Sequence, residues 1–282
     1  MLAAPNTSTD RRWDARLELG FAISGTRTAL VRRSHSGPLQ VQRPFYPEGR
    51  GGCHVYVLHP PGGLVGGDRL TIDVTAEAGA EALLTTPAAT KFYRTAGAKA
   101  EQRVSIRVAP GGVVEWLPQE TIVFGGADGE SAVHVDVESG GQFLGWELCC
   151  FGRPASGDRF ASGRFVQRLA IRIDGTPVAL ERAEFDGSSG AMHRRIALAG
   201  FPVTGAFVAV TARGELAERV RAALPATTGG ELFSVTSRRH ALVCRYLGES
   251  AERARAGFSN AWSVVREALL GKSAHAPRIW AT

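Results

Sequence analysis

The 282-residue sequence has no long apolar run and only four cysteines. No stretch approaches the ~18 consecutive apolar residues that read as a membrane-spanning helix, and the first 17 residues lack the apolar core of a secretory signal. We therefore expect a cytoplasmic protein with reduced thiols. No CxxC spacing occurs, and the adjacent Cys149 and Cys150 would point to opposite faces of a strand. We accordingly predict no tight thiolate site for a metal ion.

The signatures of nucleotide binding and of the common hydrolases are also missing. The sequence contains no P-loop, no G-x-G-x-x-G, no HExxH and no GxSxG. The seven histidines are dispersed without the spacing of a ligand box. The net charge of +6 comes mostly from scattered arginines, without a basic cluster that carries interleaved aromatics. We therefore expect no nucleic-acid partner and no membrane partner, whereas an acidic protein partner suits the charge.

Alternation of apolar and polar residues with a period of two dominates the chain. Glycine-containing turns, such as the one at Asp174 and Gly175, separate the alternating runs. This pattern predicts a mainly β fold with many strands. The apolar positions that define it include Leu17, Leu19, Phe21, Leu70, Ile72, Val74, Val104, Ile106, Val108, Val133, Val135, Val137, Leu169, Ile171 and Ile173.

Two segments in the last quarter break this period and predict helices at residues 214–224 and 250–270. Pro225 would end the first helix. Ser250 is suited to the N-cap of the second helix, and Gly271 is suited to its C-cap. No linker rich in Pro, Ser or charge divides the chain, so we predict a single domain spanning residues 1–282.

The stretch from Leu58 to Asp68, LHPPGGLVGGD, predicts a tight double turn between two strands. Its prolines end the preceding strand, and its glycines permit positive φ. Asp68 is then positioned by the backbone at the edge of this turn. Since neither phosphate-binding spacing is present, a structural turn is the better interpretation than a nucleotide site.

Several carboxylates stand in apolar strands, where they are rarely buried without a partner. Glu147 lies within FLGWELCCF, Glu181 follows Val-Ala-Leu, and Glu115 and Glu120 flank Trp-Leu-Pro. Each carboxylate could face water at a sheet edge or pair with an arginine such as Arg69 or Arg182. Together with Asp68 they could instead form an inward-facing acidic set. Such a set would suit either an acid/base pair of a glycosidase type or a route for a divalent cation.

These stretches resemble the urease accessory protein UreD family, called UreH in some species. The resemblance runs in one order through nearly the whole chain, and it is weakest over residues 184–206. The matching motifs are VQRPFYPEG, LHPPGGLVGGDRL, TPAATKFYRTAGA, EWLPQETIVF, GWELCCFGRPASGDRF and the terminal PRIWAT.

The resemblance implies a β-helical, stacked-sheet body with two helices and no enzymatic activity of its own. It implies a complex with a helical UreF-type accessory protein and a UreG-type GTPase, which docks on apo-urease and inserts nickel. No cofactor would be bound tightly, and nickel(II) would be in transit through an internal tunnel. The motif match carries the tunnel role to Asp68, Thr90, Glu147 and Glu181. A β-helical hydrolase with paired carboxylates is the alternative function.

The apolar tail PRIWAT provides candidate partner-binding residues, namely Arg278, Ile279 and Trp280. An aromatic residue this close to the end of the sequence either docks back onto the body or contacts a partner.

Overall fold

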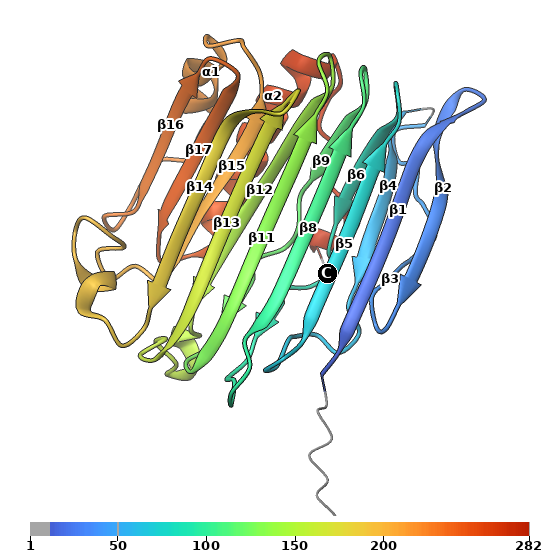
Figure 1. Cartoon of the computed structure of the whole chain (residues 1–282). Coiled ribbons are helices and arrows are strands. Elements are labelled where there is room, and N and C mark those ends of the chain that lie inside the picture. The colour runs from blue at the N-terminus through green and yellow to red at the C-terminus, as the bar shows by residue number, and fades with distance from the viewer. Residues whose placement is uncertain (1–11, 50, 282) are drawn as a thin grey trace, which may run out of the picture.

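The structure is a computed structural model that describes residues 12–49 and 51–281. Two β-sheets lie face to face, and both α-helices lie behind the second sheet in the view of Figure 1. Within the described residues the fold is mainly β with two helices late in the chain, as the sequence pattern predicts.

The first sheet has seven strands in the order β14-β13-β11-β8-β5-β1-β2. Their bounds are β1 Asp14–Ser24, β2 Arg27–Ser36, β5 Arg69–Ala76, β8 Ala100–Val108, β11 Ala127–Val137, β13 Gly163–Ile173 and β14 Thr176–Asp186.

The second sheet has ten strands in the order β16-β17-β15-β12-β9-β6-β4-β3, with β10 paired to β12 and β7 paired to β10. Their bounds are β3 Gln40–Val41, β4 Cys53–Leu58, β6 Glu81–Thr85, β7 Thr90–Phe92, β9 Val113–Trp116, β10 Thr121–Val123, β12 Gln142–Phe151, β15 Val203–Val210, β16 Leu232–Arg238 and β17 Ala241–Gly248.

The chain alternates between the two sheets, so that each coil adds one strand to both. Successive coils are β4–β5, β6–β8, β9–β11 and β12–β13, and neighbouring coils pair in parallel. Glycine turns repeat at one set of corners, where Gly79, Gly111 and Gly140 all adopt positive φ. The amide of Gly111 donates to the carbonyl of Gly140 at 3.1 Å. The result is a solenoid of stacked coils.

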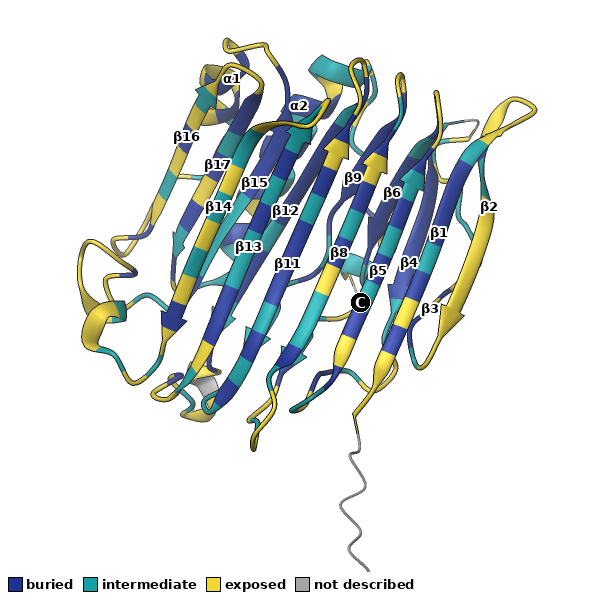
Figure 2. Cartoon of the chain, viewed as in Figure 1, coloured by how far each residue is buried: buried dark blue, intermediate teal, exposed yellow. Residues whose placement is uncertain are grey.

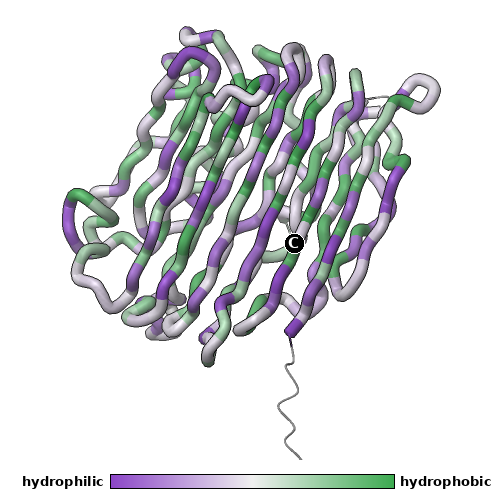
Figure 3. Tube along the Cα trace, in the orientation of Figure 1, coloured by the Kyte–Doolittle hydropathy of each residue, from purple (hydrophilic) through white to green (hydrophobic). Residues whose placement is uncertain are grey.

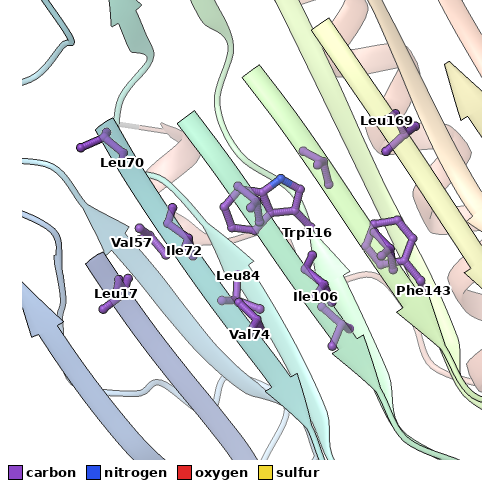
Figure 4. Close-up of a cluster of buried hydrophobic side chains, with 14 of the residues drawn as sticks. Leu17, Val57, Leu70, Ile72, Val74, Leu84, Ile106, Trp116, Phe143 and Leu169 are labelled. Carbon is purple, nitrogen blue, oxygen red and sulfur yellow. The ribbon is translucent and has the colours of Figure 1, made fainter. Parts of the chain in front are cut away.

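The main core fills the space between the sheets. Apolar and polar residues alternate along the strands of the first sheet, and buried positions alternate with intermediate or exposed ones in the same way (Figures 2 and 3). Side chains from both sheets meet in this layer, as Figure 4 shows for Ile72 of β5, Ile106 of β8 and Trp116 of β9. Burial of this apolar surface is the main favourable contribution to folding.

A second core joins the outer face of the second sheet to helices α1 (Leu216–Ala223) and α2 (Ala251–Leu270). Ser250 accepts a hydrogen bond from the amide of Arg253, and Gly271 adopts the left-handed conformation at the C-cap, so both predicted caps are confirmed. Neither helix among the described residues is long and apolar enough to cross a membrane. Three short 3-10 segments complete the chain, at Pro154–Ser156, Gly190–His193 and Arg278–Ala281.

A buried ionic network fastens α2 to the second sheet. Arg266 of α2 is 1% exposed, and its Nε lies 3.0 Å from Glu115 Oε1 on β9. Its Nη2 lies 2.7 Å from Oε2 of Glu48, and the indole of Trp262 donates to Glu115. Burial alone would raise the pKa of Glu48, but hydrogen bonds from His54 and Arg266 lower it to about 2. Glu115 therefore pairs with an arginine, which is one of the possibilities that the sequence leaves open for these carboxylates.

Replacing Arg266 with Ala should lower the free energy of unfolding by about 3–5 kcal/mol, because it leaves Glu115 buried without a cation and removes one of the two partners of Glu48. Urea unfolding measures this loss. Glu218→Ala, which removes an exposed ion pair with Arg221 on α1, is the control and should cost about 0.5 kcal/mol or less. Equal losses for both variants would contradict the structural role of the network.

Candidate functional site

Asp68 closes the glycine-rich turn that the sequence singles out. The side chain is 1% exposed, and its two oxygens accept hydrogen bonds from the amides of Trp13 at 2.8 Å and Val65 at 2.9 Å. Gly62 and Gly67 adopt positive φ within the turn. Both oxygens are thus committed to the backbone, and Asp68 lines neither of the two interior cavities described next.

A first cavity of about 210 Å³ lies between the sheets, beside this turn. Its polar lining includes His59, Thr90, Gln102, Ser131 and Glu147. Pro60 and Ala88, which lie in two different loops, also line this cavity, and both residues are exposed at the surface. Thr90 begins β7, whose pairing with β10 holds it at the cavity wall.

A second cavity of about 500 Å³ lies further along the same inter-sheet space. Its polar lining includes Glu147, Gln167, Glu181 and Arg245, and it reaches the surface at residues such as the exposed Glu184. Glu147 lines both cavities, so its side chain lies between the two. Of the four predicted tunnel residues, Thr90 lines the first cavity, Glu181 lines the second, and Glu147 lines both.

The environment of Glu147 favours its protonated form. The side chain points between the sheets, on the same face of β12 as Phe143 and Phe151. Burial raises its pKa to about 8, and the charge of Glu181 adds to this rise, while hydrogen bonds with Gln167 and Ser131 oppose it. Part of the side chain still remains accessible, because it faces the two cavities. At neutral pH this carboxyl group is mostly neutral.

Glu181 differs from Glu147 because a cation accompanies it. It extends from β14 of the first sheet and accepts a hydrogen bond from Arg245 of β17, so the ion pair spans the two sheets. Neither Arg69 nor Arg182 is its partner, because those two arginines pair with Glu101 and Glu184. The second cavity thus places the neutral Glu147 near an ion-paired carboxylate, Glu181, while Glu184 and Asp186 also line it.

Sequence reasoning missed His59, Gln167 and Arg245. His59 lines the first cavity, and its buried Nε2 has no hydrogen-bond partner among the described residues. Burial lowers the pKa of His59, and the nearby charge of Asp68 opposes this effect. The one available sequence signal was its place at the start of the turn, directly before Pro60.

The thiols offer no alternative site. Cys149 packs between the sheets, whereas Cys150 faces the helices, as expected for neighbours on a strand. Burial raises the pKa of Cys150 and of Cys244 to about 12, and it raises the pKa of Cys53 and Cys149 as well. Among residues 12–49 and 51–281, no three His, Cys, Asp or Glu side chains cluster in a way that could hold a metal ion. The polar side chains that line the two cavities therefore lie apart from one another and do not form a cluster of metal ligands.

The C-terminal tail docks onto the helical side of the body. Trp280 packs against Trp146 and Trp262, with ring centroids 5.4 and 5.9 Å away, and its Nε1 donates to Oγ1 of Thr85 at 2.8 Å. Arg278 is exposed. Trp280 thus anchors the tail to the body, whereas the cationic side chain of Arg278 is exposed.

The structure is thus a β solenoid with two helices against its second sheet and two cavities in the space between the sheets. A family model described as UreD urease accessory protein matches residues 14–281. Urease accessory proteins UreD from Azoarcus sp. and Chromohalobacter salexigens are 46% and 45% identical to the chain. The alignments cover 96% and 97% of this chain, and 94% and 90% of those proteins. The chain belongs to the UreD urease accessory protein family.

Replacing Glu147 with Gln should remove a pH dependence of stability. Because the folded carboxyl group has a pKa of about 8 against an ordinary 4.5, the folded state keeps a proton that the unfolded state loses. Stability should therefore fall as pH rises from about 4.5 to 8 in the wild type, and less steeply in Glu147→Gln. Urea unfolding at pH 5.5, 7 and 8.5 measures this difference. Glu184→Gln, an exposed carboxylate of the same cavity, is the control, and parallel curves for wild type and Glu147→Gln would refute the assignment.

Trp280→Ala should cost about 2–3 kcal/mol of stability, below the 3–5 typical of a fully buried aromatic residue. Arg278→Ala, its neighbour, should change stability by no more than about 0.5 kcal/mol. If Arg278 contacts a partner, its variant should fold normally and still copurify less of the accessory complex. Thermal unfolding and copurification separate the two roles, and a stable Trp280→Ala protein would show that the anchor is unimportant.

Proposed function

We propose that this protein acts in urease maturation as a non-catalytic scaffold that passes nickel(II) to apo-urease through the interior space between its sheets. Its partners would be apo-urease, a helical UreF-type accessory protein and a UreG-type GTPase that supplies the energy of GTP hydrolysis. Family membership supports the role in urease maturation. The proposal that an ion passes through the protein depends on one observation, which is that Glu147 lines both cavities.

The chemistry of the lining suits passage more than storage. Thr90, Glu147 and Glu181 offer oxygen ligands, which hold first-row divalent cations less tightly than thiolate or imidazole ligands do. Glu147 must lose its proton before it can bind a cation as a carboxylate, and this requirement weakens the site near neutral pH. The positive charge of Arg245 beside Glu181 weakens cation binding further. An ion that binds weakly at each position leaves as readily as it enters.

One observation favours the alternative of a hydrolase. A neutral Glu147 and an ion-paired Glu181 line the same cavity, and an acid with a raised pKa beside an ionised carboxylate is the arrangement of many glycosidases. The two functions differ in their response to substitution. Loss of a catalytic acid commonly lowers the rate by several orders of magnitude, whereas a series of weak sites loses efficiency gradually.

Single substitutions Glu147→Ala and Glu181→Ala should therefore lower nickel content and specific activity of urease only partly, with a larger loss in the double variant. The measurement is nickel per active site and urease activity in cells that express the whole urease cluster. Glu218→Ala, on the exposed face of α1, is the control for a lost carboxylate. Complex assembly must be followed in parallel by copurification.

Full activation by a folded triple variant at Thr90, Glu147 and Glu181 would contradict transit through this space. Failure of the complex to form would identify the residues as structural. Asp68→Ala is expected to act differently, because it removes two backbone hydrogen bonds of the turn and should reduce stability.

A further inference from the structure

Three of the eight large hydrophobic side chains that are exposed in the described residues gather around the Asp68 turn. These are Trp13, Val65 and Tyr93, which are 50%, 43% and 37% exposed. The amides of Trp13 and Val65 donate to the same carboxylate of Asp68, so the two residues are neighbours. Scattered exposed apolar residues are normal, but a cluster marks a surface used for binding.

Tyr93 connects this cluster to a surface hollow of about 700 Å³. The residue pairs with the turn through its amide, which donates to the carbonyl of Leu64 at 2.9 Å. Its ring stacks on that of Phe124, with centroids 5.1 Å apart and an angle of 25° between the planes. An exposed ring already stacked on a half-buried one presents a rigid apolar wall and loses little conformational freedom on binding.

The hollow carries an excess of positive charge. Arg94 and Arg159 line it, and both are exposed. Neither has a carboxylate within ion-pair distance in the part of the chain that the structure describes. The carboxylate of Asp158 accepts hydrogen bonds from the amides of Gly125 at 3.0 Å and Phe160 at 2.9 Å, so it is occupied by the backbone.

We propose that the surface formed by Trp13, Val65, Tyr93, Phe124, Arg94 and Arg159, the Tyr93 face, binds an acidic segment of a protein partner. That segment presents an aromatic or aliphatic side chain to the stacked rings and an adjacent Asp or Glu to the arginines. Arginine suits this role because its planar guanidinium forms paired hydrogen bonds with a carboxylate.

The Tyr93 face adjoins the first cavity. The segment from His59 to Gly62 lines that cavity, and Val65 of the same turn belongs to the Tyr93 face. A partner bound there would therefore lie close to the first cavity. This inference rests on the proposed function, because the possible partners that we consider are the proteins of the urease maturation assembly.

A photo-crosslinking amino acid placed at Tyr93 tests this inference in cells that express the whole urease cluster. The control places it at Ile23, which is 51% exposed at the other end of β1. We expect a crosslink from position 93 to an Asp- or Glu-containing segment of a copurifying subunit, and none to that subunit from position 23. Absence of a crosslink at position 93, a crosslink to residues 1–11 of this chain, or one to a segment without carboxylates would overturn the inference.

Charge reversal provides the second arm. Arg94→Glu with Arg159→Glu should weaken binding of the crosslinked partner about tenfold or more at low salt, whereas replacement of both by Lys should weaken it less. Arg194→Glu with Arg195→Glu makes the same change of net charge at another exposed site and is the matched control. Equal affinities of the two reversed variants would refute the inference. If the wild-type chain copurifies no urease maturation protein, the proposed function itself fails.

Discussion

A carboxyl group buried between packed layers, either sheet on sheet or helix on sheet, needs a proton, a counter-charge or water, and this requirement organises the interior of the molecule. Burial of an unpaired charge is costly, so such a group either finds a cation or becomes neutral. Glu115 finds Arg266, and the result is a fixed structural joint. Glu147 forms no ion pair within the described part of the chain and keeps its proton at neutral pH. The same type of side chain is thus an ion-paired structural contact in one place and a neutral, cavity-lining group in the other.

The solenoid provides the space in which this difference matters. Each coil contributes one strand to each sheet, so inward-facing residues from distant coils line one continuous layer. Large apolar side chains fill most of that layer, while small or polar residues such as Ser131 and Gln167 line the cavities around Glu147. The helices pack on the outer face of the second sheet, so they do not enter the space between the two sheets. The helix-covered face and the layer that contains the cavities therefore lie on opposite sides of the second sheet.

Period-two alternation was sufficient to predict the strands, and the local caps Ser250 and Gly271 were sufficient to place the ends of the second helix. These features depend on neighbours in the sequence. The fate of each carboxylate depends on contacts across the fold, because Arg266 reaches Glu115 over 151 positions and Arg245 reaches Glu181 over 64. Glu115 and Glu147 therefore look alike in the sequence and differ in the structure. His59 and the hollow beside Tyr93 were missed for the same reason.

The protonation state of Glu147 in the presence of nickel tests the account most directly. Carbon-13 NMR of glutamate-labelled protein, with the resonance assigned by its loss in Glu147→Gln, follows the carboxyl group through a pH titration with and without nickel(II). The account predicts a pKa of about 8 in the free protein and a shift of the titration to lower pH when nickel is added. A carboxyl group that titrates near its ordinary value of 4.5 and does not respond to nickel would contradict it.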